Sequence, residues 1–159
     1  MRVPRELLYH PLAPGFAALS CLLAALVLQH VMGWLPCPLC ILQRLSLIGL
    51  MISLLVWAPK HPTRKYGMLA VLVFCAGGVA GAAAQLHLLM APQSTTCGPG
   101  LALTLNQIVE ALPAGAWLLE GAGACDDARY SILGLPLPLY SAVAHIGLGG
   151  WAFVIQRRA

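Results

Sequence analysis

Residues 16–57 read FAALSCLLAALVLQHVM, GWLPCPLC and ILQRLSLIGLMISLLVW, which is two apolar stretches joined by a short connection. Each stretch approaches the ~20 residues that an α-helix needs to cross the ~30 Å hydrocarbon core of a bilayer. Two further apolar stretches run from about Gly67 to Leu89 and from about Leu137 to Ile155. Open strands are excluded from lipid, because their backbone groups would lack hydrogen-bond partners. The sequence therefore predicts an all-α bundle of four transmembrane helices, with spans at about 16–32, 41–57, 67–89 and 137–155.

The composition supports a membrane protein rather than a water-soluble one. Apolar residues make up 60% of the 159-residue chain and charged residues 9%, against about 45–50% and about 25% in soluble domains. The first stretch is not expected to be a removable signal peptide, because no small-residue cleavage site follows it and another span does. We therefore expect residues 1–159 to form a single integral-membrane domain.

Basic residues are distributed unequally between the two sides of the predicted bundle. Seven of the nine lie on one side: Arg2, Arg5, Lys60, Arg64, Lys65, Arg157 and Arg158. The other side has Arg44 and Arg129, together with four of the five acidic residues. The positive-inside rule then places both termini in the cytoplasm and the loops at about 33–40 and 90–136 outside. Basic residues next to spans indicate topology, so the net charge of +4 does not indicate nucleic-acid binding.

This topology sorts the six cysteines. Cys21 and Cys75 lie within spans, where we interpret them as small core residues. Four cysteines lie in the outer loops, two in each, where disulfides persist if that side is the periplasm: Cys37, Cys40, Cys97 and Cys125. In the longer loop, apolar residues recur at helical spacing between Leu101 and Leu112, which predicts a short helix on the membrane surface.

The first outer pair forms the motif Cys37-Pro38-Leu39-Cys40. A helix that begins within this motif would favour a thiolate, because its free N–H groups carry partial positive charge. Arg44 lies one helical turn after Cys40, where it could stabilise a thiolate or an anionic reduced quinone. Two alternatives remain: a structural disulfide beside an arginine that reaches to the interface, or a zinc site completed by Cys97 and Cys125.

The second outer pair, Cys97 and Cys125, is set among small and flexible residues. Cys97 precedes Gly98-Pro99-Gly100, and Cys125 follows Gly121-Ala122-Gly123-Ala124. Such surroundings leave the sulfur atoms approachable, which suits thiol–disulfide exchange. A purely structural disulfide is the alternative, and closing so long a loop would stabilise the fold by about 3–4 kcal/mol.

Several motifs together resemble the disulfide bond formation protein B (DsbB) family over nearly the whole chain. They are Gln29-His30-Val31-Met32 before Pro36-Cys37-x-x-Cys40, then Arg44, His87 before Cys97, and Cys125 followed by Leu133-Gly134-Leu135 and Pro138. Tyr130 and Tyr140 depart from the family, because tryptophan is common at both positions. These departures affect quinone type and partner docking rather than the cysteine relay.

The resemblance implies a quinone-dependent thiol oxidase of the bacterial inner membrane, with its active loops in the periplasm. A DsbA-like thioredoxin-fold partner would attack the disulfide Cys97–Cys125 and form a mixed disulfide with Cys97. Electrons would pass to the disulfide Cys37–Cys40 and then to ubiquinone or menaquinone. Cys40 would face the quinone, whose head Arg44 and His87 would bind. No metal or nucleic acid is expected.

Other interpretations concern partner choice and helix packing. Three alternative functions remain. The chain could be a paralogue with a dedicated partner, a non-catalytic protein braced by its disulfides, or a relative of vitamin K epoxide reductase. The pair Gly77 and Gly81 predicts close helix packing, and His145 predicts an interhelical hydrogen bond.

Overall fold

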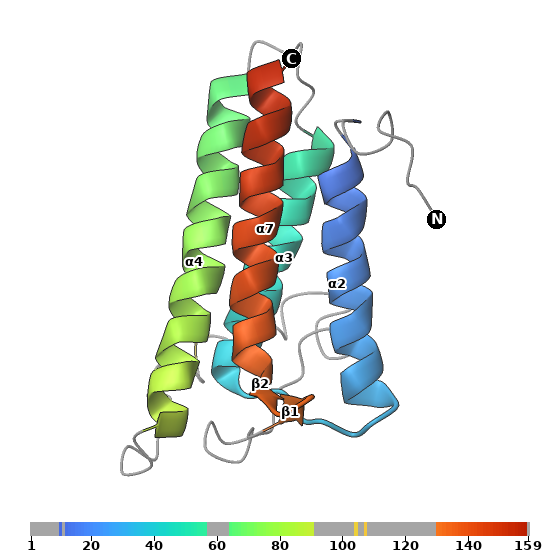
Figure 1. Ribbon diagram of the computed structural model, residues 1–159, viewed down its shortest axis with the longest axis vertical. Helices are drawn as coiled ribbons and strands as arrows, with labels where there is room; N and C mark the ends of the chain where they lie inside the picture. The colour runs from blue at the N-terminus through green and yellow to red at the C-terminus, as the bar shows by residue number, and fades with distance from the viewer. Residues whose placement is uncertain are drawn as a thin grey trace.

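The computed structural model describes residues 10, 12–56, 64–90, 104, 107 and 130–158. Four helices lie side by side with nearly parallel axes (Figure 1): α2 (Ala13–His30), α3 (Pro38–Val56), α4 (Arg64–Met90) and α7 (Leu137–Arg158). Helices α2, α4 and α7 contain stretches that are long and apolar enough to cross a membrane, and α3 contains the shorter apolar stretch Pro38–Leu54. The predicted all-α bundle is confirmed, and the chain is a multi-pass membrane protein.

The helices pack around an apolar core in the half of the bundle that is remote from the cysteine motif. Helix α3 contacts all three other helices, and α4 also packs along α7. Each helix contributes buried side chains to the core: Ala18, Leu22, Leu47, Leu50, Leu54, Met68, Val71, Leu148 and Ala152. This core fixes the helices relative to one another, so the residues at their opposite ends are held in place as well.

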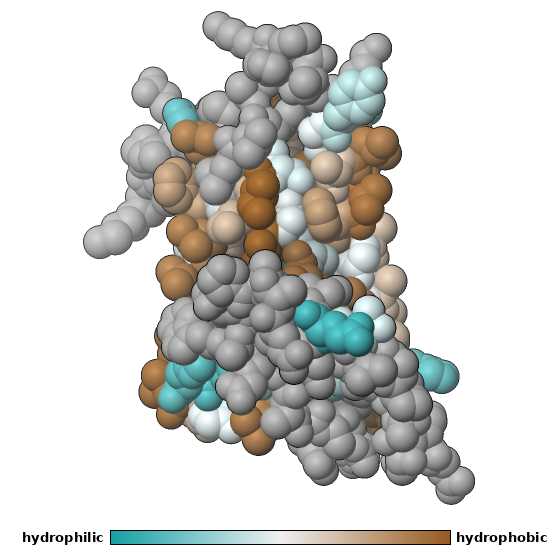
Figure 2. All heavy atoms as spheres, turned by 180° about the vertical axis from the view of Figure 1, so that it is seen from behind, coloured by the Kyte–Doolittle hydropathy of each residue, from teal (hydrophilic) through white to brown (hydrophobic). Residues whose placement is uncertain are grey.

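The flanks of the bundle carry large apolar side chains on their outer surface. Figure 2 shows brown apolar residues exposed between the two ends of the molecule. Exposed apolar area of this extent is typical of a surface that faces another apolar phase. Residues on these flanks include Leu23, Val27, Leu69, Leu72, Val73, Val143 and Ile146.

Close packing of α4 against α7 depends on Gly78. A Cβ atom at Gly78 would lie 2.2 Å from the ring of His145, whereas a Cβ atom at Gly77 would meet nothing within 4 Å. The sequence pattern predicted Gly77 and Gly81 as the packing pair. Gly81 does face α3, where a Cβ atom would lie 3.3 Å from Cγ of Gln43, but the expectation for Gly77 was wrong by one position.

A small hairpin precedes α7 and was not predicted from the sequence. Strand β1 (Ser131–Ile132) pairs antiparallel with β2 (Leu135–Pro136). The two turn residues both have positive φ, 52° at Leu133 and 80° at Gly134, as in the tight turns that join hairpin strands. Leucine rarely adopts this conformation, so in the dipeptide Leu133-Gly134 only the glycine indicates a turn.

Helices α2 and α4 finish, and α3 and α7 begin, at the same end of the bundle, beside the hairpin (Figure 1). We call this the site end. In the longer predicted loop, Thr104 and Gln107 are helical, and the rest of the predicted surface helix lies outside the described residues. Cys97 and Cys125 also lie outside them.

Candidate redox site

The sulfur of Cys37 caps the first turn of α3. The backbone N–H of Ile41 donates to the carbonyl oxygen of Cys37 at 3.1 Å. The backbone N–H of Cys40 donates to the sulfur of Cys37 at 3.4 Å. A cysteine thus occupies the N-cap position, where a side chain accepts a hydrogen bond from the third helical residue. Pro38 takes the first helical position, where a missing N–H costs nothing. The helix start therefore folds the motif so that both sulfurs point the same way.

The two sulfurs of the motif lie within bonding reach of each other. The Sγ atoms of Cys37 and Cys40 are 3.0 Å apart, about 1 Å more than a disulfide bond. Cys37 is completely buried, whereas Cys40 is partly exposed. The hydrogen bond to Cys40, together with burial, raises the pKa of the Cys37 thiol. The pair can therefore form a disulfide, and only Cys40 is open to a small molecule.

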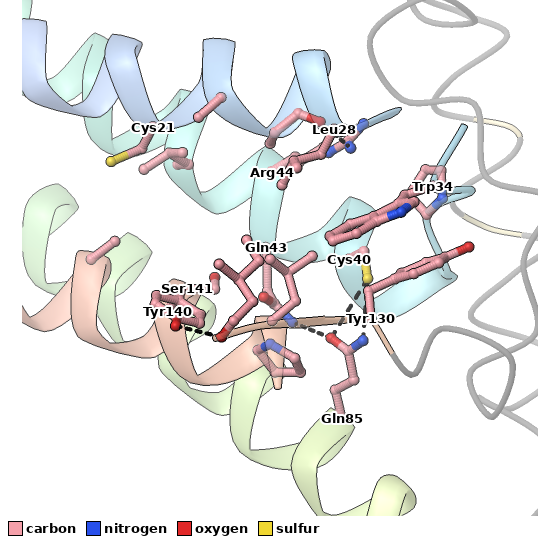
Figure 3. Close-up of a pocket in the computed structure, with 18 of the residues that line it drawn as sticks. Cys21, Leu28, Trp34, Cys40, Gln43, Arg44, Gln85, Tyr130, Tyr140 and Ser141 are labelled. Carbon is pink, nitrogen blue, oxygen red and sulfur yellow. Dashed lines mark hydrogen bonds between the residues drawn. The ribbon is translucent and has the colours of Figure 1, made fainter. Parts of the chain in front are cut away.

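A glutamine amide contacts the sulfur of Cys40, and a second glutamine contacts the first. Nε2 of Gln85 on α4 donates to the sulfur at 3.3 Å, and Oε1 of Gln85 lies 3.6 Å from it. Gln43, on α3, donates from Nε2 to Oε1 of Gln85 at 2.9 Å. Figure 3 shows these contacts, with Gln85 reaching from α4 to the cysteine. Both amides are buried, and only 1% of the surface of Gln85 is exposed.

Arg44 is buried one turn deeper on α3 and is held by α2. Its guanidinium donates to Oε1 of Gln29 and, through Nη2, to the carbonyl oxygen of Ala25 at 3.2 Å. Only 8% of Arg44 is exposed. A permanent cation in an apolar bundle is costly unless it is hydrogen-bonded or offset by an anion. These partners, from Gln29 and Ala25, are neutral oxygens, and the charge of the guanidinium would stabilise an anionic ligand or thiolate near Arg44.

A cavity of about 270 Å³ opens beside Cys40 and Arg44. Its walls come from α2, α3, α4 and α7, from the connection between α2 and α3, and from the hairpin region. It reaches Cys21 and His145, which lie roughly 12–14 Å along their helices from the site end at 1.5 Å per residue. Most lining side chains are apolar, and the polar ones include Gln43 and Gln85. A flat apolar ring with polar edges would match this lining.

Two aromatic rings stack beside Cys40 and form part of the cavity wall. The rings of Trp34 and Tyr130 have centroids 4.7 Å apart and are tilted by only 5° (Figure 3). Tyr130 also packs against the small cluster formed by Cys37 and Leu39. The hydroxyl of Tyr140 donates to the carbonyl oxygen of Ile132 at 2.7 Å and ties the hairpin to α7.

His145 makes the predicted interhelical hydrogen bond. Its Nε2 lies 3.1 Å from Oγ of Ser46 on α3, and its Nδ1 lies 2.8 Å from the carbonyl oxygen of Ser141. Because a carbonyl can only accept, Nδ1 carries a proton. Cys75 donates to the carbonyl oxygen of His145 at 3.3 Å. Cys75 and His145 thus have packing roles, although His145 and Cys21 also line the inner part of the cavity.

The structure brings together three of the predicted site residues, Cys37, Cys40 and Arg44. His87 is exposed on α4 and does not line the cavity, because residues two apart on a helix face away from each other and Gln85 takes the inward position. Its predicted contact with a quinone stays a prediction. Gln43 and Gln85 were not predicted from the sequence, where their only signal is an amide within an apolar stretch.

Comparison with known proteins identifies the family of this chain. The sequence model of the family described as "Disulfide bond formation protein DsbB" matches residues 10–155. Curated relatives named Disulfide bond formation protein B are similar over most of both chains. The relative from Saccharophagus degradans is 39% identical over 132 residues, covering 80% of this chain and 79% of its own. The relative from Stutzerimonas stutzeri is 37% identical over 133 residues, covering 78% of each chain.

A third relative, from Xanthomonas axonopodis pv. citri, is 34% identical over 145 residues and covers 87% of this chain and 84% of its own. The resemblance inferred from the cysteine motifs is therefore confirmed by family and by individual relatives. The chain belongs to the DsbB family, membrane oxidoreductases that act in disulfide bond formation.

Proposed function

We propose that this protein oxidises a periplasmic DsbA-like dithiol protein and passes the electrons to a membrane quinone. One observation carries the proposal: Cys40 and Arg44 line the same cavity, and Cys37 lies 3.0 Å behind Cys40. A dithiol that can close into a disulfide thus borders a space lined mainly by apolar side chains. An electron acceptor dissolved in the bilayer could enter such a space.

The proposed reaction at the cavity is a two-electron exchange. The sulfurs of Cys37 and Cys40 form a bond with each other and lose two electrons to the quinone. The two thiol protons end on the two quinone oxygens, so that the products are one disulfide and one quinol. Since a thiolate is the reactive form of cysteine, Cys40 begins the reaction as the partly exposed sulfur.

The cavity suits a quinone ring as the substrate. Its volume of about 270 Å³ is close to the lower end of ligand pockets, ~300 Å³, which fits a compact ring system. Trp34 and Tyr130 supply aromatic surface beside Cys40, and Arg44 supplies a cation for oxygen atoms that gain negative charge. Ubiquinone and menaquinone both have such rings.

The outer pair, Cys97 and Cys125, would exchange with the partner protein. In this scheme Cys97 forms the mixed disulfide and Cys125 passes electrons inward to Cys37. Tyr130 supports the scheme, because it packs against the cluster of Cys37 and Leu39. It follows Cys125 by five positions, which span at most about 18 Å of extended chain. Cys37 is covered in the described arrangement, so this step requires that its cover moves.

Redox potentials favour a quinone as the acceptor. The reduction potential of a DsbA-type dithiol couple is about −120 mV, which is roughly 80 mV above that of a glutathione-like buffer at about −200 mV. Reoxidising it with such a buffer would cost about 3.7 kcal/mol for two electrons. The DsbA–DsbB–quinone route is known to keep the bacterial periplasm oxidising. With both termini cytoplasmic, as the basic residues predict, the site end would face that compartment.

The test is quinone reduction by the purified protein with a reduced DsbA-like donor. We expect reduction to require both the donor and the quinone, and to stop in a variant with Cys40→Ser. A protein whose disulfides only brace its loops would bind donor weakly or not at all and would reduce no quinone. That result would overturn the proposal.

A further inference from the structure

The environment of Cys40 contains a pair of buried amides for which the relay itself gives no role. Gln85 reaches from α4 to the sulfur, and Gln43 on α3 contacts Gln85 rather than the sulfur. Buried polar groups in an apolar bundle are costly unless they are hydrogen-bonded. These two amides satisfy each other and the sulfur, which makes the three side chains one hydrogen-bonded unit.

The direction of the hydrogen bonds determines what this unit does to Cys40. Nε2 of Gln43 donates to Oε1 of Gln85 at 2.9 Å. An amide has one oxygen that accepts and one nitrogen that donates, so this contact turns the nitrogen of Gln85 toward the sulfur. Nε2 of Gln85 lies 3.3 Å from Sγ of Cys40, and Oε1 lies farther away at 3.6 Å.

The same amide can hydrogen-bond both protonation states of the cysteine. A thiol can donate weakly to Oε1, whereas a thiolate can only accept, and it would accept from Nε2. Hydrogen bonds to a charged partner are roughly twice as strong as neutral ones. The amide therefore stabilises the thiolate more than the thiol. Complete burial of Gln85 keeps water from replacing it.

We infer that Gln85 is a catalytic residue that hydrogen-bonds the Cys40 thiolate, and that Gln43 is a positioning residue that orients the Gln85 amide. Arg44 stabilises the same anion from one turn deeper on α3. This assignment deepens the proposed function, because it explains how Cys40 becomes reactive before it meets its acceptor.

The test measures the reactivity of Cys40 without donor or quinone. Fully reduced protein is treated with iodoacetamide at a pH well below the midpoint of the wild-type alkylation profile, where the rate follows the thiolate fraction of Cys40. Alkylation is followed by mass spectrometry of the Cys40 peptide. In Gln85→Met, which keeps the side chain's length but lacks the amide, we expect alkylation to slow about threefold or more. The thiolate fraction falls when the thiolate loses its hydrogen bond, and the higher nucleophilicity of the remaining thiolate offsets only part of that fall. Gln85→Glu should slow it as well, since a carboxylate only accepts.

Two further variants separate this role from packing. Gln43→Met should slow alkylation less than Gln85→Met, because the amide of Gln85 remains but is free to turn. Leu88→Met, on the same helix and against the Cys37–Leu39 cluster, should leave the rate unchanged. If Gln85→Met does not fold, Gln43→Met and Gln85→Glu decide the question.

An unchanged or faster alkylation rate in folded Gln85→Met or Gln85→Glu would overturn the inference and would mean that the amide oxygen faces the sulfur. The outcome is independent of the proposed function. If the wild-type protein fails to reduce quinone but these variants slow alkylation, the quinone proposal falls and the role of Gln85 stands.

Discussion

Replacement of Arg44 by leucine tests the cation at the cavity. Arg44 is 92% buried, since 8% of it is exposed, and it shares the cavity with Cys40. A charge-assisted hydrogen bond contributes about 1.5–3 kcal/mol. We therefore expect Arg44→Leu to raise the quinone concentration for half-maximal rate by about tenfold or more, where tenfold corresponds to about 1.4 kcal/mol.

The structure also predicts an effect of Arg44→Leu on stability. Gln29 would lose its guanidinium partner, and a buried acceptor without a partner costs about 1–3 kcal/mol. The double variant Arg44→Leu/Gln29→Leu removes both partners and should recover much of this loss. It should not recover quinone affinity. Arg44→Lys should restore affinity only in part, because lysine offers a point charge without the planar fork of arginine.

The assay is a quinone titration at saturating donor, with thermal unfolding in detergent for each variant. The two readouts separate binding from folding, since the double variant is expected to be stable and still deficient. An unchanged half-saturating concentration in a folded Arg44→Leu variant would refute the reasoning. Arg44 would then only brace α3 against α2, and the quinone head would lie elsewhere.

Three further predictions concern the cysteines, the aromatic stack and helix packing. Serine at any of the four relay cysteines should abolish donor-dependent quinone reduction, whereas Cys75→Ser should not; the relay cysteines are Cys37, Cys40, Cys97 and Cys125. Near-normal turnover of a Cys125→Ser variant would exclude the relay through two cysteine pairs. Tyr130→Ala should slow turnover, because it removes a stack with Trp34 that contributes about 0.5–1.5 kcal/mol. Tyr130→Phe should keep both the stack and the wild-type rate. Equal turnover of the Tyr130→Ala and Tyr130→Phe variants would show that the stack does not contribute to function. Gly78→Ala should lower the free energy of unfolding by about 1–3 kcal/mol through overpacking against His145, and Gly77→Ala, which has open space, should not; equal melting temperatures would contradict the packing argument.

The helical bundle could be predicted from sequence because long apolar stretches have few alternatives in lipid. The hairpin could not, because each strand has two residues and its turn places a leucine at positive φ. Strands this short leave no alternation pattern. Their pairing depends on contacts with α7, among them the hydrogen bond from Tyr140.

The cysteine motif and Arg44 were predictable because they lie close together in sequence on one helix. Gln85 could not be assigned to the site, because its contact with Cys40 joins two helices across 45 positions of the chain. The stack between Trp34 and Tyr130 joins still more distant segments, so the sequence does not place these two rings side by side. Sequence predicts contacts within one helix turn far better than contacts between helices.

The most direct test of the central claim uses only the inner pair. A variant with Cys97→Ser and Cys125→Ser is fully reduced and mixed with quinone in the absence of donor. Quinol formation is followed by absorbance, and the Cys37–Cys40 disulfide is followed by mass spectrometry after acid quenching. We predict one quinol for each disulfide formed. A dithiol that stays reduced in the presence of excess quinone would contradict the claim that Cys37 and Cys40 deliver electrons to it.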